Sequence, residues 1–313
     1  MRPILILTGR DDLTADVVVE ELVKRGEPVV RYDTADFPTA SRLAVRLTGD
    51  GWAGSLTGSR TVRLETVKSV WWRRPNEFVT PDGWPGRARA LAVSEARSGL
   101  LGVLCSLPVR WINHPASDAA ANYKPRQLAV AAGRAPLRDH LRPRLRPRVH
   151  RGRTRGLQGA RRRRARPSGK AAVPPGFLVS ADDMDDGVTG TAHLFQERVE
   201  KAYEVRLTVI GDRMFPVAIH AGSAAAQLDW RTDYRSLTYE RVAIPPEVED
   251  GVRRLMDELG LFFGALDFAV TPAGRWVFFE VNPNGQWHWI AVKAVVPLVE
   301  AMADALQGEI TCP

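Results

Sequence analysis

The chain has 313 residues, of which 44% are hydrophobic, so it can form one large domain or two to three small domains with buried cores. Its two cysteines, Cys105 and Cys312, exclude a disulfide framework, and neither has the neighbour spacing of a metal ligand. The first apolar run, residues 4–7, is too short for a signal peptide or a membrane span. We therefore expect a cytoplasmic protein with no membrane partner.

The net charge of +8 comes from one segment. Residues 134–166 hold 14 of the 44 Lys and Arg residues and one of the 36 acidic residues, which leaves 30 basic against 35 acidic residues elsewhere. Apart from His140 and His150, this segment has no aromatic side chain that could stack on bases. The composition therefore argues against a nucleic-acid partner.

The N-terminal third predicts an α/β domain. The expected elements, in chain order, are a strand at 4–7, a helix at 13–25 that ends at Gly26, and strands at 28–32, 42–48, 61–64 and 67–73. The first three form a β-α-β unit. The G-x-G-x-x-G spacing of dinucleotide-binding proteins is absent after the first strand.

Two tryptophans and two arginines, Trp71 to Arg74, follow one another at the end of the last of these strands. Two interpretations are open. The Trp rings pack in the core while Arg73 and Arg74 lie at a rim, or the Arg pair captures carboxylates of an acidic substrate. A planar guanidinium can bind a carboxylate through two hydrogen bonds.

Residues 119–132 predict an amphipathic helix that contains Lys124. A lone Lys on a helix is usually just solvated. The following segment, residues 134–175, has neither helical nor strand periodicity, and Pro and Gly interrupt any helix longer than two turns. Its literal interpretation is a disordered basic linker or an RNA-binding arm.

Residues 203–210 alternate as a strand does. Side chains of one face are Tyr203, Val205, Leu207 and Val209, and those of the other are Glu204, Arg206 and Thr208. The polar face is either merely amphipathic or places an acceptor for ribose hydroxyls beside a cation for phosphate.

Residues 263–270 and 276–282 are rich in aromatic and β-branched side chains and predict an antiparallel hairpin. If Ala273-Gly274 is a two-residue loop, Asp267 lies directly opposite Glu280. Facing carboxylates among apolar side chains repel each other unless a cation or a proton intervenes.

Asn282 shares a strand face with Glu280 because side chains alternate along a strand. The pattern thus brings together two carboxylates and an amide oxygen. Oxygen ligands without His or Cys favour Mg²⁺ over zinc. The alternative is an ordinary hairpin whose acidic side chains face solvent.

The loop at residues 227–234 is polar and aromatic and contains Arg231. This arginine either orients a substrate carboxylate or forms a structural ion pair with Asp229 or Asp233. Residues 247–259, capped by Gly260, and residues 292–306 predict packing helices.

These motifs resemble one enzyme family. Asp267-Phe268 on one strand and Glu280-Val-Asn282-Pro-Asn on the next resemble the metal-binding strands of ATP-grasp ligases, which activate carboxylates. The longer run at residues 279–287 is similar to the ATP-grasp ribosomal peptide maturases, the graspetide synthetases. The resemblance covers most of the chain outside residues 134–175.

The resemblance implies an α/β protein with an ATP-grasp fold. We expect an N-terminal α/β pre-ATP-grasp domain at residues 1–115, a linker helix and lid region at 116–190, and a C-terminal ATP-grasp subdomain at 191–313.

The resemblance also implies roles for individual residues, with ATP and Mg²⁺ as cofactors. Asp267, Glu280 and Asn282 are the expected metal ligands, and Lys124 reaches the nucleotide phosphates. Gln196, Glu197 and Val199 form the adenine hinge, Glu204 holds the ribose, and Arg206 contacts phosphates or substrate. Arg206 and Arg231 are the candidate catalytic residues.

The resemblance breaks down at residues 134–175, where the family has a lid with a phosphate-binding Lys. Only Lys170 is present there, in a context without strand character. A shifted reading frame in a GC-rich gene would produce this Arg-rich composition. We therefore interpret the segment as frame-shifted, the lid as disrupted and this chain as impaired in activity. A genuine but unusual lid is the alternative.

The activity implied is ATP-dependent ligation on a ribosomal precursor peptide with a leader and an acidic core. Asp or Glu side chains become acyl phosphates and are then joined to hydroxyl or amine groups as ω-ester or ω-amide crosslinks. Homo-oligomer formation stays open. Two alternatives are an ATP-grasp ligase for a small molecule or protein tail, and a non-catalytic RNA- or partner-binding protein on this scaffold.

Overall fold

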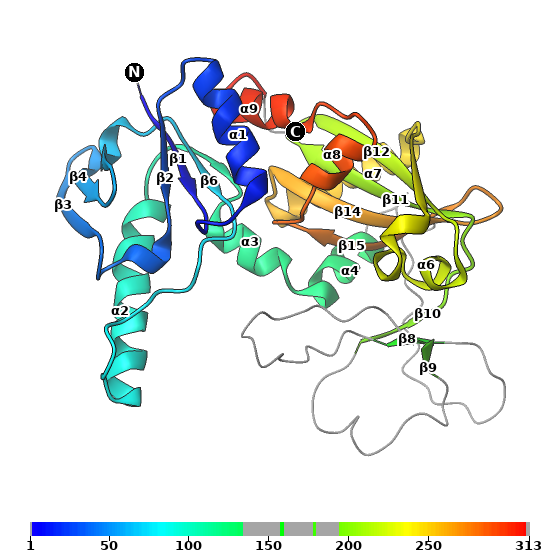
Figure 1. Ribbon diagram of the computed structural model, residues 1–313, viewed down its shortest axis with the longest axis horizontal. Coiled ribbons are helices and arrows are strands. Elements are labelled where there is room, and N and C mark those ends of the chain that lie inside the picture. The colour runs from blue at the N-terminus through cyan, green and yellow to red at the C-terminus, as the bar shows by residue number, and fades with distance from the viewer. Residues whose placement is uncertain (1, 134–156, 160–177, 180–193, 311–313) are drawn as a thin grey trace.

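The computed structural model describes residues 2–133, 157–159, 178–179 and 194–310 (Figure 1). Its helices are α1 (Leu13–Lys24), α2 (Gly86–Cys105), α3 (Pro115–Ala121), α4 (Lys124–Gly133), α6 (Ala224–Leu228), α7 (Pro246–Leu259), α8 (His288–Lys293) and α9 (Leu298–Gln307). Its strands are β1 (Ile4–Leu7), β2 (Val29–Tyr32), β3 (Arg42–Thr48), β4 (Gly51–Thr57), β5 (Thr61–Arg63), β6 (Ser69–Trp72), β7 (Arg110–Ile112), β8 (Leu157–Gly159), β9 (Leu178–Val179), β10 (Phe195–Glu197), β11 (Tyr203–Ile210), β12 (Arg213–Ala221), β13 (Leu237–Arg241), β14 (Phe263–Val270) and β15 (Trp276–Asn282).

The N-terminal sheet is parallel, with strand order β2-β1-β6-β7. Helix α1 starts at Asp12, whose carboxylate accepts hydrogen bonds from the N–H groups of Thr14 and Ala15, an N-cap that satisfies otherwise unpaired donors. All four residues of β1 are fully buried, as expected for a central parallel strand. The predicted β-α-β unit is confirmed.

A second, antiparallel sheet, β3-β4-β5, packs beside the first. The sequence pattern missed β4, because its run is interrupted by glycine. Gly54 lies at φ +139°, and a Cβ at this position would stand 2.2 Å from the carbonyl oxygen of Ala44. Close approach of the paired strand β3 therefore requires glycine inside this strand.

The C-terminal sheet is antiparallel, with strand order β13-β12-β11-β14-β15. Its two faces pack against different layers. One apolar core joins β11, β14 and β15 to α4 and α7, and another joins the opposite face to α1, α8, α9 and the N-terminal sheet. Helix α9 lies against α1 (Figure 1), so the two sheets share a core.

Two predicted helices are broken in the structure. The helix predicted at 119–132 is two helices, α3 and α4, which are separated at Asn122 and Tyr123. The helix predicted at 292–306 is likewise α8 and α9. Pro297 disfavours helical backbone in the residue before it, and Val295 adopts a left-handed conformation at φ +51°.

The hairpin of β14 and β15 confirms the predicted pairing of Asp267 with Glu280, although the turn differs from the prediction. The strands stop at Val270 and Trp276, which pair with each other, so the connection is longer than two residues. A register shift between Asp267 and Phe268 then restores the expected partner of Asp267.

A small sheet, β10-β8-β9, lies in the expected lid region. Strand β8 corrects the expectation that the segment at 134–175 lacks regular structure. The rest of that segment lies outside the described residues, as does Lys170. Within the described part of the chain, no helix is long and apolar enough to cross a bilayer.

Candidate active site

The polar face of the C-terminal sheet carries a row of charged side chains. Arg206 on β11 pairs with Asp267 on β14, which pairs with Glu280 on β15, so three neighbouring strands contribute one residue each. The three side chains are buried, with exposed fractions of 7%, 7% and 3%. A merely amphipathic strand and a hairpin with solvent-facing acids are both excluded.

The predicted metal ligands come together as expected. Glu280 and Asn282 are two apart on β15, and the Asn282 side-chain amide donates to Glu280 Oε1 at 3.3 Å. That contact uses the nitrogen, so the amide oxygen of Asn282 is available as a ligand. In the described part of the chain, no group of three His, Cys, Asp or Glu residues could hold a metal. The donor set is therefore two carboxylates and an amide oxygen, which suits Mg²⁺.

The two facing carboxylates are paired with cations of the protein itself. Arg206 Nε lies 3.2 Å from Asp267 Oδ1, and the Lys124 ammonium pairs with Glu280 Oε2. Lys124 is the first residue of α4 and its side chain is 37% exposed. The structure thus brings Lys124 to the predicted metal ligands, where its charge offsets the repulsion between the carboxylates.

Glu204 lies on the same face of β11 as Arg206 and is also buried. Burial raises the pKa of Glu204, although the ammonium of Lys201, which is bonded to its carboxylate, acts in the opposite direction. Lys201 also donates to the carbonyl of Leu228 at 3.3 Å. Sequence reasoning missed Lys201, because the residue precedes the alternating strand and local pattern gives it no distinctive place.

The predicted catalytic residue Arg231 lies in a short 3-10 turn, η5 (Trp230–Thr232). Its Nε and Nη2 donate to the two carboxylate oxygens of Asp229 at 2.7 Å each. Burial lowers the pKa of Arg231, but the paired Asp229 more than offsets this and the net shift is upward. The ion pair with Asp229 is confirmed, whereas Asp233 bonds Ser223 instead.

The indole of Trp230 is in contact with two guanidinium groups and a second indole. Arg206 and Arg231 lie over its ring at 5.7 and 5.8 Å from the centroid, and Trp289 of α8 stacks on it with centroids 5.0 Å apart. Cation–π contacts of this kind hold guanidinium groups without consuming their N–H donors. Trp230 therefore connects the loop arginine with the strand arginine of the charged row.

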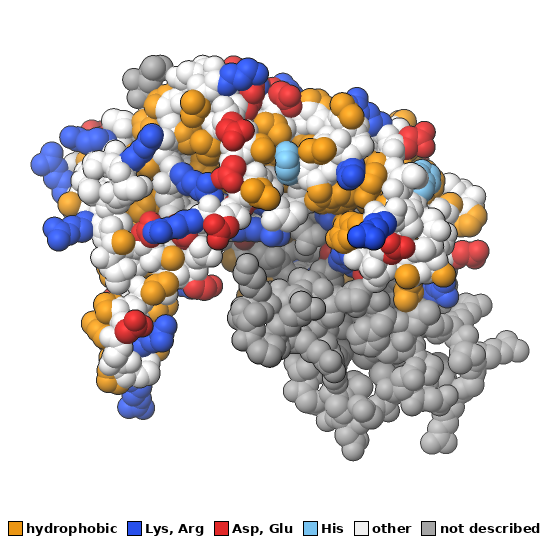
Figure 2. Space-filling view, viewed as in Figure 1, with side chains coloured by type: hydrophobic (Ala, Val, Ile, Leu, Met, Phe, Trp, Pro, Cys, Tyr) orange, Lys and Arg blue, Asp and Glu red, His pale blue; other side chains and the backbone are white. Residues whose placement is uncertain are grey.

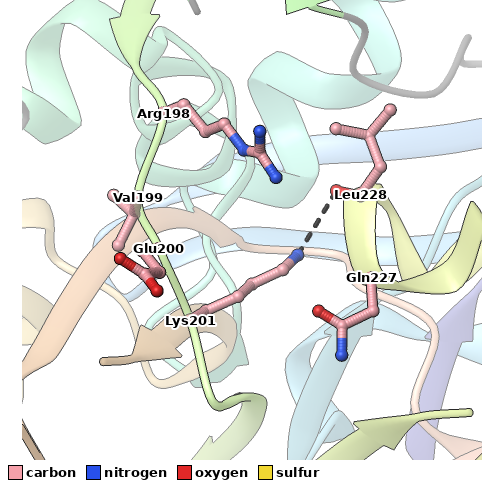
Figure 3. Close-up of a pocket in the computed structure, with 6 residues that line it drawn as sticks. All are labelled: Arg198, Val199, Glu200, Lys201, Gln227 and Leu228. Atoms are coloured by element: carbon pink, nitrogen blue, oxygen red, sulfur yellow. Dashed lines mark hydrogen bonds between the residues drawn. The ribbon is translucent and has the colours of Figure 1, made fainter. Parts of the chain in front are cut away.

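A cavity of about 220 Å³ lies beside the predicted adenine hinge (Figure 3). Its lining residues are Arg198, Val199, Glu200, Lys201, Gln227 and Leu228. Val199 thus faces the cavity, whereas Gln196 and Glu197 lie on β10 outside its lining. The cavity places Lys201, and through it Glu204, next to the hinge.

The structure confirms the first interpretation of the Trp-Arg run for Trp71, which is buried in the core, and for Arg74, which is exposed, but corrects it for Arg73. Its side chain is 1% exposed and pairs with Asp12 at 3.1 Å. It also donates to the carbonyls of Asn284 and Gly285 and to Gln286 Oε1. Arg73 therefore binds the loop that follows β15, and it is neither at a rim nor open to a substrate carboxylate.

Charges on this face balance. The described cations Lys124, Lys201, Arg206 and Arg231 are paired with Glu280, Glu204, Asp267 and Asp229, respectively. Over the described part of the molecular face in Figure 2, acidic and basic side chains are likewise interspersed. A balanced set of this kind can exchange partners when a metal and an anionic ligand enter together.

Comparisons with known proteins agree with this site. The family model of the MvdD pre-ATP-grasp domain matches residues 3–119. The macrocyclase MdnC of Microcystis aeruginosa MRC, solved with the precursor peptide MdnA, is 25% identical, with 98% of this chain and 99% of that chain covered and a TM-score of 0.79. A search of curated proteins finds no match.

Two further solved structures have the same fold. The RiPP-associated ATP-grasp ligase of Chryseobacterium gregarium, in complex with ADP and a leader and core peptide, is 22% identical over 100% of this chain and 98% of that chain, with a TM-score of 0.82. The ATP-grasp ligase PsnB, in complex with a precursor variant, Mg and ADP, is 20% identical over 98% of both chains, with a TM-score of 0.72.

The chain therefore has the fold of ATP-grasp ligases, and its N-terminal part, residues 3–119, matches the MvdD pre-ATP-grasp domain. Within that class it resembles the ribosomal peptide maturases, which confirms the resemblance found in the sequence.

Proposed function

We propose that this protein joins acidic side chains of a ribosomal precursor peptide to hydroxyl or amine groups as ω-ester or ω-amide crosslinks, at the expense of ATP. The observation that carries the proposal is the buried row Arg206, Asp267 and Glu280, with Asn282 and Lys124 beside it. Relatives with this fold are solved with precursor peptides, and PsnB with Mg and ADP.

The residues divide between metal, nucleotide and substrate. Asp267, Glu280 and Asn282 hold Mg²⁺, which when bound neutralises charge on the phosphate oxygens of ATP. Lys124 and Arg206 then turn from their carboxylate partners toward the phosphates, because the metal replaces them as counter-ions. Their part is positioning and charge stabilisation.

On the nucleotide side, Glu204 accepts hydrogen bonds from the ribose hydroxyls. Gln196, Glu197 and Val199 form the hinge that binds adenine, and the cavity that Val199 lines supports this role. Raising the pKa of Glu204 by burial favours its protonated form, but the ammonium of Lys201 favours the carboxylate that accepts these bonds.

The chemistry has two steps. A substrate carboxylate attacks the γ-phosphorus of ATP, so a carboxylate–phosphorus bond forms and ADP leaves. A hydroxyl or amine of the peptide then attacks the acyl carbon of the acyl phosphate, loses its proton and releases inorganic phosphate. Arg231, fixed by Asp229 and by Trp230, is the group that orients the acidic side chain near this reaction.

We also propose the domain limits 1–115, 116–190 and 191–313, a cytoplasmic location, and a frame shift across residues 134–175 that impairs this chain. Translation of the gene in the alternative frames tests the last point. A strand-helix-strand pattern with a Lys after an apolar run supports it. Absence of that pattern in both frames, with a chain that still turns over ATP and peptide, contradicts it.

The experiment is co-expression with candidate precursor peptides, meaning small acidic peptides that a search of the neighbouring reading frames finds, with mass spectrometry as the readout. Each crosslink removes one water from the peptide mass. The chain as printed, a version with residues 134–175 translated in the alternative frame, and Glu280→Gln are compared. We expect water loss with the corrected version and none with Glu280→Gln. An unchanged peptide mass with both of the first two versions contradicts the proposal.

A further inference from the structure

Strand β15, which carries Glu280 and Asn282, is an edge strand of the C-terminal sheet. On its outer edge, where a further strand would pair, backbone groups of β15 form hydrogen bonds with a side chain. The Val281 N–H donates to Gln127 Oε1 at 3.0 Å, and Gln127 Nε2 donates to the Val281 carbonyl at 2.8 Å. The same nitrogen donates to the carbonyl of Ala121, at the end of α3, at 2.6 Å.

The Gln127 side chain is therefore bonded both to the end of α3 and to β15. Gln127 is 2% exposed, and both the nitrogen and the oxygen of the carboxamide are bonded to backbone. Val281 pairs with Leu266 across the sheet, yet its own N–H and carbonyl point outward to α4. A carboxamide is the side chain that can accept from one backbone group and donate to two others.

The bonded residue, Val281, lies directly between the two predicted metal ligands of β15. The helix that carries Gln127 also carries Lys124, three residues earlier and so on the same face. Lys124 pairs with Glu280. One helix face thus bonds the strand backbone at Val281 and places a cation on the neighbouring carboxylate.

We propose that Gln127 is a positioning residue of the active site. It fixes α4 on β15 and so sets the position of the Lys124 ammonium relative to Glu280 and Asn282. The inference rests on the proposed function, because it concerns how the Mg²⁺ and nucleotide ligands are held.

The test is binding of Mg²⁺ together with a non-hydrolysable ATP analogue, measured by calorimetry on the full chain. Gln127→Met keeps the length and volume of the side chain but makes no such hydrogen bonds. Groups that orient metal ligands typically change metal affinity 10- to 100-fold when replaced. We expect Gln127→Met to weaken Mg–nucleotide binding at least about tenfold.

Ser69→Ala is the matched control for lost stability. The Ser69 hydroxyl is buried and donates to the carbonyl of Leu306 at 2.7 Å, which joins β6 to α9 away from the charged row. We expect this variant to lose thermal stability yet bind within about twofold of the wild type. A Gln127→Met variant that binds as Ser69→Ala does would overturn the proposal.

A double-mutant cycle separates positioning from general loosening. If Gln127 acts through Lys124, adding Gln127→Met to Lys124→Met weakens binding by no more than about twofold beyond Lys124→Met alone. Independent, multiplicative losses contradict this role. If Gln127→Met does not fold, Gln127→Glu replaces it in the cycle, since its carboxylate still accepts from Val281.

The outcomes distinguish this inference from the function on which it rests. A wild-type chain that binds no Mg–nucleotide overturns both. A wild-type chain that binds, with Gln127 variants that bind equally well, overturns the positioning role alone.

Discussion

Two buried arginines, Arg73 and Arg206, behave differently although each is paired with one carboxylate. Arg73 lies 3.1 Å from Asp12 and Arg206 lies 3.2 Å from Asp267. Arg73 is also bonded to three acceptors of a single loop, the carbonyls of Asn284 and Gly285 and the side chain of Gln286. Arg206 instead has a long contact of 3.4 Å to the carbonyl of Ala265 and packs over Trp230.

The difference separates a structural charge from one that can change partners. The other donors of Arg73 are bonded to two backbone carbonyls and a side-chain amide of one loop, so Arg73 fixes the N-terminal sheet to the loop that follows β15. The main partner of Arg206 is a carboxylate that a metal ion can take over. The comparison predicts that stability depends more on Arg73 and ligand binding more on Arg206.

Replacement of Arg73 should have the largest effect on stability. Arg73→Met removes the cation paired with the buried Asp12 carboxylate and one donor to each of the three loop acceptors. Breaking a buried ion pair by removing one partner costs about 3–5 kcal/mol. Urea unfolding followed by tryptophan fluorescence should show a loss of this size, with no recovery at saturating Mg²⁺. A loss of unfolding free energy under about 1 kcal/mol would contradict the structural role of Arg73 and so the difference between the two arginines.

The stability of Arg206→Met, unlike that of Arg73→Met, should depend on Mg²⁺. Removal of the Arg206 guanidinium leaves Asp267 facing Glu280, and the repulsion lowers stability in metal-free buffer. Mg²⁺ should restore part of that stability, because the ion occupies the place of the guanidinium. In the version with residues 134–175 translated in the alternative frame, product formation should fall at least about a hundredfold, the usual scale for a lost electrostatic stabiliser. Thermal melts with and without Mg²⁺ check the first point, and unchanged turnover contradicts the second.

Glu204→Ala should weaken ATP binding roughly tenfold or more, since one buried hydrogen-bonding partner is worth about 1–3 kcal/mol when removed. The comparison variant is Lys201→Met, which keeps the Glu204 side chain but removes the cation that favours its carboxylate form, so we expect a smaller loss than with Glu204→Ala. Calorimetry with both variants checks the assignment. Equal losses in the two variants assign the pair a structural role, and no loss in Glu204→Ala removes the ribose contact.

Replacement of Asp118, which lies on α3 and accepts a hydrogen bond from Asn284 in the loop after β15, should give the smallest effect on stability. Burial raises the pKa of Asp118 to about 6, while hydrogen bonds from Asn122 and Asn284 lower it. A raised pKa means that the folded state binds the proton more tightly, so this contribution is present at low pH and is lost as pH rises through about 6. Between about pH 4 and pH 7, the unfolding free energy of the wild type should therefore fall by on the order of 1 kcal/mol, and that of Asp118→Asn should not. Wild-type and variant pH profiles that run parallel contradict this.

The part of the site that lies on the C-terminal strands could be predicted from the sequence. Alternation along residues 203–210 places Glu204 and Arg206 on one face, and pairing across the hairpin places Asp267 opposite Glu280. Both inferences need only the two-residue period of a strand and an approximate turn. The predicted two-residue turn was wrong, but the register shift between Asp267 and Phe268 still places Asp267 opposite Glu280.

Contacts between distant segments could not be predicted. Gln127 and Val281 are 154 residues apart, and Arg73 and Asn284 are 211 apart. No local period connects such pairs, so the roles of Gln127 and Arg73 depend on the packing of α4 and β6 against β15 and its following loop. The sequence analysis missed the breaks between α3 and α4 and between α8 and α9. Apolar periodicity continues across both breaks, although the backbone leaves the helical conformation there.

The central claim is that the charged face of the C-terminal sheet binds nucleotide through a metal ion held by Asp267, Glu280 and Asn282. The most direct test is calorimetric titration of a non-hydrolysable ATP analogue, with and without Mg²⁺, into the wild type and Glu280→Gln. We predict that Mg²⁺ strengthens binding to the wild type at least about tenfold and has little effect on the folded Glu280→Gln variant. An equal Mg²⁺ dependence in both proteins would contradict the account.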